Sequence, residues 1–125
     1  MSSADDFAAK LAGRFLVIDG PDGAGKSTQQ RLLAAWLTER GVDVVTARDP
    51  GGTAIGDRIR AVLLDHASAA MTPACETMLY MASRAQLYGE VIAPARARGA
   101  CVLCDRWVSS TIAYQAAAGM EPARI

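Results

Sequence analysis

The sequence predicts an α/β fold in which a parallel sheet carries helices on both faces. Three short apolar segments, at 15–18, 42–48 and 101–104, have the composition of strands. Segments with helical spacing of apolar residues alternate with them, and such alternation is typical of parallel sheets. No internal repeat, low-complexity tract or linker interrupts the 125 residues. We therefore expect one domain over residues 14–125, preceded by an N-terminal extension over residues 1–13 that is frayed or forms a short amphipathic turn.

Local signals set the bounds of each element. The first apolar segment is bounded by Gly20 and Pro21 and predicts a fully buried strand. Gly41 ends the helix that follows. Thr72 and Pro73 are an N-cap and first-turn pair for a long helix, which Pro94 would kink near its end. Beyond the three strands, the expected elements are helices at 26–40, 53–65 and 72–98, a loop at 49–52 and a last helix beginning near residue 109 or 110.

Composition excludes several classes of protein. The 13 basic and 13 acidic residues give a net charge of 0, which argues against a protein that coats nucleic acid or an anionic membrane. No apolar run reaches the roughly 18–20 residues of a membrane span. Asp5 and Asp6 lie in a first segment that lacks the apolar core of a secretion signal. The three cysteines (Cys75, Cys101 and Cys104) fit reduced thiols, so we expect a cytoplasmic protein.

Residues 20–27 match the pattern GxxxxGK[ST] between a strand and a helix, which is the context that a phosphate-binding loop requires. The glycines allow backbone N–H groups to turn toward phosphate oxygens, and the helix start adds the positive end of its dipole. Lys26 would reach the outer phosphates, and the hydroxyl of Ser27 suits a Mg²⁺ ligand. The alternative is a glycine-rich turn without a ligand. The motif predicts a P-loop NTPase fold that binds a nucleotide.

Other features narrow the class of P-loop protein. A GTPase would carry an Asn-Lys-x-Asp motif, and this chain contains no Asn. Asp105 follows an apolar strand, so a motor or transporter ATPase stays possible on this ground alone. Asp105 could orient magnesium-bound water while Arg106 faces a second phosphate; the alternative is a surface ion pair. Tyr80 and Arg84, four residues apart on one helix, could stack on a base and bond its edge, or pack together as a cation–π pair.

A further set of polar candidate site residues lies near the start of the last expected helix: Ser110, Tyr114 and Gln115. Capping by Ser109 or Ser110 is the alternative interpretation.

Four blocks together carry a family resemblance. They are Gly20-Pro21-Asp22-Gly23-Ala24-Gly25-Lys26-Ser27-Thr28, Arg48-Asp49-Pro50-Gly51-Gly52-Thr53, Leu79-Tyr80-Met81-Ala82-Ser83-Arg84, and Cys104-Asp105-Arg106-Trp107 continuing through Ser110, Thr111, Ala113, Tyr114 and Gln115. In their order and spacing the chain resembles the N-terminal part of a bacterial-type thymidylate kinase. This family phosphorylates dTMP to dTDP with ATP and Mg²⁺ in dTTP synthesis, on a nucleoside monophosphate kinase-like P-loop fold.

The resemblance implies a role for each matching residue. The catalytic residues would be Lys26, Asp105 and Arg106, and Mg²⁺ would be held by Ser27 and, through water, by Asp105. The ATP phosphates would be held by Gly20, Pro21, Asp22, Gly23, Ala24, Gly25, Lys26, Ser27 and Thr28. The residues implied for dTMP are Asp22, Asp49, Arg60, Tyr80, Arg84, Arg106, Ser110, Tyr114 and Gln115.

Within the implied dTMP site, Asp22 would meet the 3′-hydroxyl, and Arg60 and Arg106 would clamp the phosphate. Tyr80 would stack on thymine, where the family usually has Phe, and Arg84 would bond a thymine carbonyl. Ser110 and Gln115 would read the base further, and Tyr114 would close the sugar side and favour deoxyribose. Asp49 stands where most bacterial members have Glu, and Trp107 replaces a more usual Tyr or His. No general base is needed, because the attacking phosphate oxygen is already anionic.

The chain also departs from the family. Family members are longer, so by resemblance the lid, two C-terminal strands and the adenine-contacting loop are missing here. Gly23 supplies no catalytic arginine from within the loop. We therefore expect the 125 residues alone to be inactive, and the full-length protein to form a homodimer. The alternatives are a kinase for another nucleoside monophosphate, or an inactive nucleotide-binding or dimer-forming fragment. We expect no catalytic role for His66, and no metal or redox role for Cys101 and Cys104.

Overall fold

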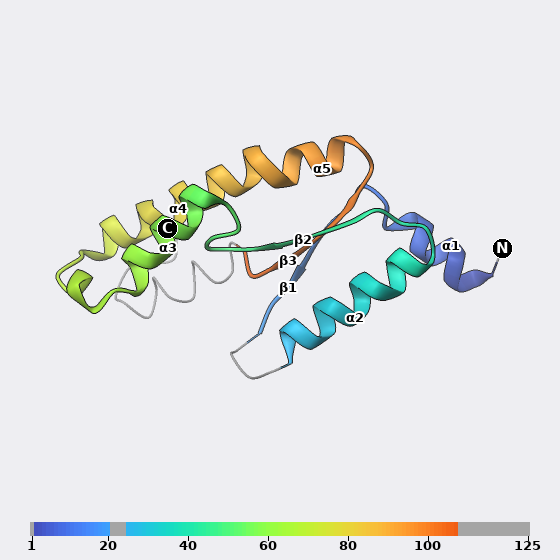
Figure 1. The fold of residues 1–125 in the computed structure, drawn as a ribbon, viewed down its shortest axis with the longest axis horizontal. Helices are drawn as coiled ribbons and strands as arrows, with labels where there is room; N and C mark the ends of the chain where they lie inside the picture. The colour runs from blue at the N-terminus through green and yellow to red at the C-terminus, as the bar shows by residue number, and fades with distance from the viewer. Residues whose placement is uncertain (1, 21–24, 108–125) are drawn as a thin grey trace.

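The computed structural model describes residues 2–20 and 25–107, and three strands form its sheet. The strands β1 (Phe15–Ile18), β2 (Val44–Arg48) and β3 (Cys101–Asp105) are parallel, in the order β1-β3-β2 (Figure 1). The parallel sheet expected from the sequence is thus confirmed. β2 begins two residues later than expected, because Val42 packs in the core beneath α2 as part of the turn after that helix.

Helices connect the strands, as parallel pairing requires. Thr53 and Thr72 cap their helices as side-chain acceptors, for the N–H groups of Gly56 and Cys75 respectively. The helical elements are α1 (Ser3–Lys10), α2 (Lys26–Glu39), α3 (Ala54–Leu64), a 3₁₀ turn (His66–Ser68), α4 (Pro73–Leu87), a π-helical segment (Tyr88–Ile92) and α5 (Ala93–Ala97). The expected last helix lies outside the described residues.

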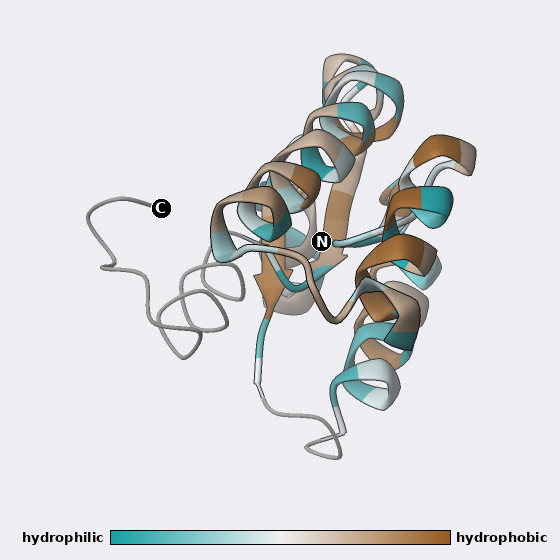
Figure 2. Ribbon diagram, turned by 90° about the vertical axis from the view of Figure 1, so that its left-hand side faces the viewer, coloured by the Kyte–Doolittle hydropathy of each residue, from teal (hydrophilic) through white to brown (hydrophobic). Residues whose placement is uncertain are grey.

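Helices cover both faces of the sheet, as expected, and β3 is the centre of the core. Successive side chains of a strand point to opposite faces. Val102 and Cys104 pack with the α4–α5 side, whereas Cys101 and Leu103 pack with α2, and all four are fully buried. Figure 2 shows the apolar strands between the two layers of helices. A strand buried on both faces explains the unbroken apolar sequence 101–104.

The expectation that the first strand would be fully buried was wrong. β1 lies at an edge of the described sheet, with only β3 beside it, and the Val17 side chain is 40% exposed. Strand order depends on pairings distant in sequence, so an apolar segment alone does not distinguish an edge strand from a central one.

The long helix after Thr72 is helical to Ala97 but changes its winding before Pro94. Residues Tyr88–Ile92 form a π-helical segment between α4 and α5. Proline has no N–H and its ring collides with the carbonyl four residues earlier, so a wider turn just before it relieves both problems. The expected kink is therefore a local change of helix type.

The N-terminal segment forms α1, whose Ser2 cap accepts a hydrogen bond from the Asp5 N–H. Ala8 is fully buried in the cluster beneath α2, and the Phe7 ring meets the Trp36 ring edge-on at 6.2 Å between centroids. Within residues 2–20 and 25–107, no helix is long and apolar enough to span a membrane.

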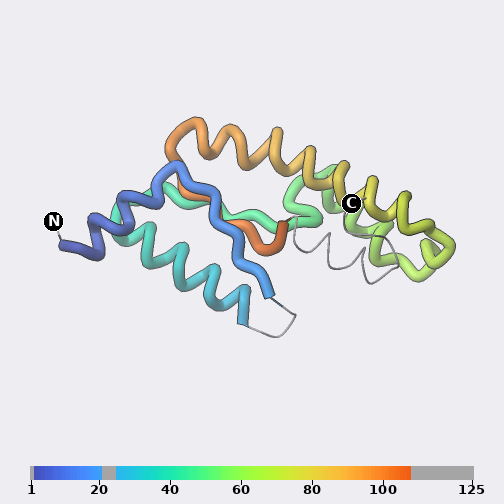
Figure 3. The backbone as a smooth tube through the Cα atoms, turned by 180° about the vertical axis from the view of Figure 1, so that it is seen from behind, coloured from blue at the N-terminus to red at the C-terminus, as the bar shows by residue number. Residues whose placement is uncertain are grey.

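The carboxyl ends of all three strands meet at one edge. Ile18 and Arg48 are both register partners of Asp105. The chain leaves β1 at this edge and returns along α2 in the opposite direction (Figure 3). The segments that follow residues 18, 48 and 105 are therefore neighbours, and this edge is where parallel α/β sheets bind ligands.

Candidate active site

The phosphate-loop lysine and the acid that ends β3 meet at this edge. Lys26 is the first residue of α2, and its Nζ lies 3.2 Å from Oδ1 of Asp105. Gly25 before it adopts φ +86°, a left-handed conformation that glycine accepts without strain. Ser27 is exposed at the same helix start. Pro21, Asp22, Gly23 and Ala24 lie outside the described residues.

Gln30 ties α2 to the sheet one turn beyond Lys26. Its Nε2 donates to the carbonyl oxygen of Leu103 at 2.9 Å and to that of Ala47 at 3.4 Å. These contacts fix the helix start relative to the strand ends. Sequence reasoning missed this residue, because a glutamine on a helix gives no sign of the backbone carbonyls it meets across the sheet.

The chain bends sharply after β3, where Arg106 adopts φ +69°. A non-glycine residue rarely takes this left-handed conformation. Here the bend is supported on both sides, because the Arg106 N–H donates to the Ile18 carbonyl at 3.1 Å and the Cys104 thiol donates to the Arg106 carbonyl at 3.0 Å. The bend therefore fixes where the Arg106 side chain leaves the strand.

A buried ion pair joins α4 to the end of β2. Both Nε and Nη2 of Arg84 donate to Oδ2 of Asp49, at 3.0 and 2.7 Å. Arg84 is 7% exposed and Asp49 only 1%. Burial raises the pKa of the Asp49 carboxyl, and the hydrogen bond and charge of Arg84 oppose that rise. The structure thus brings together two of the residues predicted for dTMP.

The loop after β2 is held against α3 and α4 by its backbone. Gly51 N–H donates to the buried Ser83 hydroxyl at 3.0 Å, and Gly52 N–H donates to Asp57 Oδ1 at 3.0 Å. Arg60 Nη1 donates to the Pro50 carbonyl at 3.4 Å, which draws Arg60 to the loop. Ser83 belongs to one of the four blocks that carry the family resemblance, but the sequence analysis assigns it no role. The available signal was its position directly before Arg84 on the buried face of the helix.

Tyr80 is the remaining predicted dTMP residue that the structure describes. Tyr80 is half-buried on α4, one helical turn before Arg84, so the two lie on one face as the spacing predicted. Trp107 lies beside Arg84, whose guanidinium carbon is 5.1 Å from the centre of the Trp107 ring. Ser110, Tyr114 and Gln115 lie outside the described residues.

The two cysteines of β3 have the buried environment of structural thiols. Cys101 and Cys104 are buried in β3, Cys75 is exposed, and all three are unpaired. Burial raises the pKa of Cys101, and burial together with the Asp49 and Asp105 carboxylates raises that of Cys104 to about 12. Within the described residues, no three His, Cys, Asp or Glu side chains gather as metal ligands.

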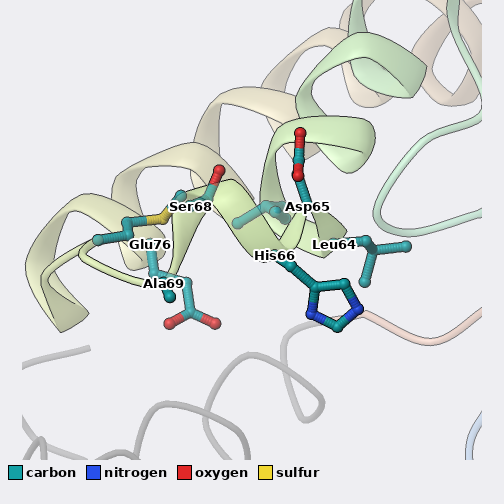
Figure 4. A pocket seen from close by; sticks show the side chains of 8 residues that line it. Leu64, Asp65, His66, Ser68, Ala69 and Glu76 are labelled. Atoms are coloured by element: carbon teal, nitrogen blue, oxygen red, sulfur yellow. The ribbon is translucent and has the colours of Figure 1, made fainter.

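His66 lies in an exposed turn, as expected, in the 3₁₀ segment between α3 and α4. It lines a shallow hollow of about 400 Å³ between the end of α3 and the start of α4, with Glu76 and several apolar side chains (Figure 4). Among the residues that the structure describes, none of the predicted phosphate or base contacts lines this hollow.

Comparisons with known proteins agree with this geometry. The family model described as thymidylate kinase matches residues 18–123. A thymidylate kinase from Exiguobacterium sp. is 53% identical over 105 residues, which are 84% of this chain and 50% of the relative. One from Pseudomonas entomophila is 52% identical over the same length and the same shares of both chains. The chain thus spans about half the length of the curated relatives it matches.

A solved structure gives the same result for the fold. The crystal structure of thymidylate kinase from Ehrlichia chaffeensis matches with a TM-score of 0.79 and 33% identity, over 89% of this chain and 63% of that chain. The P-loop fold expected from the sequence is confirmed by this match. With a phosphate-loop lysine paired to the acid at the end of β3, and with a family model that covers most of its length, the chain belongs to the thymidylate kinase family.

Proposed function

We propose that the full-length protein transfers the γ-phosphoryl group of ATP to dTMP and releases dTDP and ADP. The observation that carries this proposal is the meeting of Lys26 and Asp105, beside Arg106, at the carboxyl edge of the sheet in a member of this family. A lysine at a helix start and an arginine at a strand end supply two separate cationic positions. A phosphoryl-transfer enzyme needs both, because donor and acceptor are each anionic.

In this proposal the donor phosphates lie at the start of α2. The 14 residues of α2 direct the positive end of their dipole toward this point, and Lys26 is the first of them. The Lys26 side chain is only 10% exposed, and Asp105 accepts from its ammonium group at 3.2 Å. That contact directs Nζ to the strand ends, where it would meet the outer phosphates.

Mg²⁺ fits the side chains available here. Ser27 offers a hydroxyl and Asp105 a carboxylate, and these oxygen ligands are the kind that Mg²⁺ prefers. The part of the chain described in the structure has no larger acidic cluster, which suits an ion that takes most ligands from phosphates and water. When bound, the ion would neutralise charge on the transferred phosphate.

The acceptor phosphate would lie between Arg60 and Arg106. An oxygen of the dTMP phosphate attacks the γ-phosphorus in line, a new P–O bond forms, and the bond to the bridging β-phosphate oxygen breaks. The attacking oxygen is anionic at neutral pH, so no side chain has to remove a proton. The work of the protein is positioning and charge neutralisation. Asp22 would hold the 3′-hydroxyl of the sugar.

The base would lie against the face of α4. Tyr80 would stack on thymine while Arg84 donates to a carbonyl, and the two residues share one helical face. Ser110 and Gln115 would add further contacts to the base, and Tyr114 would close the sugar side. These last three positions complete the proposed acceptor site.

We also propose a cytoplasmic homodimer without nucleic-acid or membrane partners. The unpaired thiols fit a reducing compartment. Exposed apolar side chains on α3 and α4, among them Ile55, Met78 and Met81, support pairing of two copies through helices.

Substrate competition tests the proposed function. We expect ADP release by the full-length protein, with ATP and Mg²⁺, to be fastest with dTMP and much slower with dUMP, dCMP and AMP. A preference for AMP or dCMP would instead support a kinase for another nucleoside monophosphate. Removal of Mg²⁺ with a chelator should abolish turnover, and its return should restore it.

A further inference from the structure

The beginning of α2 carries no apolar side chain. Residues 26–31 are all polar or charged, and the side chain of Leu32 is 56% exposed. The residues that pack α2 against the apolar cluster around β3 come later in the helix: Leu33, Ala34, Trp36 and Leu37. Burial of apolar surface therefore holds the later turns of α2, whereas its beginning, where the donor phosphates would lie, depends on polar contacts.

Two polar side chains on one face of α2 reach the sheet. Lys26 and Gln30 are four residues apart and so share a face of the helix. Lys26 contacts Asp105, and Nε2 of Gln30 donates at 2.9 Å to the carbonyl oxygen of Leu103, two residues earlier in β3. The same nitrogen donates at 3.4 Å to the Ala47 carbonyl oxygen in β2. An amide nitrogen carries two N–H groups, so one side chain can join two neighbouring strands.

The two contacts differ in what the binding of substrates would do to them. In the proposed function Lys26 meets the outer phosphates and Asp105 orients magnesium-bound water, so the contact between them is shared with the ligands. Gln30 instead contacts backbone carbonyl oxygens within the strands, which have no part in the proposed reaction. The contacts of Gln30 can therefore hold the start of α2 in one place before, during and after phosphoryl transfer.

The two strands that Gln30 joins lead directly to the acceptor side of the site, because β2 continues into Asp49 and β3 into Arg106. We propose that Gln30 is a positioning residue that holds the helix carrying the donor phosphates in line with the acceptor phosphate at the strand ends. This inference rests on the proposed function and adds to it. Gln30 acts through the placement of Lys26 relative to Arg106 and contacts neither nucleotide itself.

Loss of this tether should change the alignment of the substrates more than their affinity. ATP, held by the phosphate loop, would move together with the start of α2, and dTMP would stay with the strand ends and α4. Each nucleotide would keep its own contacts, but the attacking oxygen and the γ-phosphorus would lose their in-line geometry. A misplacement of ~1 Å can lower a rate on the order of 10²-fold. The effect should therefore be found in kcat.

Steady-state kinetics on variants of the full-length protein test this inference. Gln30→Met keeps the length of the side chain and removes its N–H donors. We expect it to lower kcat at least ~10-fold and to leave KM for ATP and KM for dTMP within about 3-fold of the wild type. Gln29→Met is the matched control, because Gln29 is the neighbouring residue of the same type and is exposed. It should leave all three constants unchanged.

Two further variants show whether the N–H donors of Gln30 are responsible. Gln30→Lys keeps N–H donors on an arm of similar length, whereas Gln30→Glu keeps the shape of the side chain but offers only acceptors at neutral pH. We expect kcat to fall in the order wild type, Gln30→Lys, Gln30→Met, with Gln30→Glu lowest, because its carboxylate would face two carbonyl oxygens. A role in packing alone would favour Gln30→Met, and a role of shape alone would favour Gln30→Glu. If Gln30→Met does not fold, Gln30→Lys and Gln30→Glu give the same comparison.

The outcomes separate this inference from the proposed function. An unchanged kcat in Gln30→Met, or an equal loss in Gln29→Met, would overturn the inference. A loss that lies wholly in KM for ATP would overturn it too, because Gln30 would then support the ATP site alone. So would a Gln30→Lys variant that is no more active than Gln30→Glu. In each of these cases a wild-type protein that phosphorylates dTMP leaves the proposed function intact. If the wild type binds ATP but does not phosphorylate dTMP, the proposed function fails first, and this inference fails with it.

Discussion

The Nζ atom of Lys26 lies 3.2 Å from Oδ1 of Asp105, although 79 residues separate the two in sequence. The contact joins the first residue of α2 to the last residue of β3. It places the phosphate-loop cation at the end of the central strand β3, which lies between β1 and β2. The predicted donor and acceptor sites are built around this contact.

Replacement of this lysine should abolish catalysis without unfolding the protein. We expect Lys26→Met to lower kcat at least ~10²-fold. The first turn of α2, which the structure describes, has no other basic side chain that could replace Nζ at the phosphates. The chain offers a matched control in Lys10, the only other lysine, which is exposed at the end of α1. Steady-state kinetics on Lys10→Met should match the wild type; equal losses in both variants would contradict the assignment.

The close approach of α3 to the loop after β2 should make Gly56 sensitive to substitution. A Cβ at Gly56 would lie 2.8 Å from Thr53 Oγ1 and 3.1 Å from both the Gly51 carbonyl and the Ser83 hydroxyl. We expect Gly56→Ala to lower the free energy of unfolding by about 1–3 kcal/mol in urea denaturation. Gly89→Ala is the control, because nothing lies within 4 Å of its added Cβ. Equal stability of the two variants would contradict the close packing around Gly56.

The thiols should differ in reactivity. Because the pKa of Cys104 is raised to about 12, almost none of it is thiolate at pH ~8, and its burial excludes reagents as well. Iodoacetamide should therefore modify the exposed Cys75 in the folded protein and spare Cys101 and Cys104 until denaturant is added. Peptide mass spectrometry reads the sites directly, and rapid native labelling of Cys104 would contradict a buried β3.

The buried Asp49 should make stability depend on pH. Its pKa is raised above 3.8 in the folded state, so an unfolded chain loses this proton at lower pH. Between the two pKa values the folded state binds more protons, and the free energy of unfolding falls as pH rises. Urea unfolding between about pH 3 and 7 should therefore show the wild type losing stability relative to Asp49→Asn as pH rises through this window. The opposite slope would mean that Arg84 outweighs burial.

Much of the fold could be predicted from the sequence because its signals are local. Thr72 with Pro73 marks a helix start, and the apolar segment 101–104 marks a strand buried on both faces, whatever the rest of the chain does. The edge position of β1 could not be predicted, because it depends on pairing with a strand more than eighty residues away. The π-helical segment before Pro94 was foreseen only as a kink.

The sequence predicts which residues belong to the candidate site better than it predicts how those residues are arranged. The phosphate-loop pattern and the one-turn spacing of Tyr80 and Arg84 follow from short stretches of sequence. The pairing of Arg84 with Asp49 does not, because it joins residues 35 positions apart through the packing of α4 against the sheet. Gln30 and Ser83 were missed for a similar reason, since their partners are backbone groups whose positions only the folded chain defines.

The most direct test of the proposed reaction follows the phosphoryl group itself. The full-length protein, incubated with γ-labelled ATP, Mg²⁺ and dTMP, should move the label into dTDP, as chromatography of the nucleotides would show. Arg84→Ala should lower kcat/KM for dTMP in this reaction at least ~10-fold and leave ATP binding intact. A wild-type protein that binds ATP but transfers no label to dTMP would contradict the assignment of this chain's site to thymidylate phosphorylation.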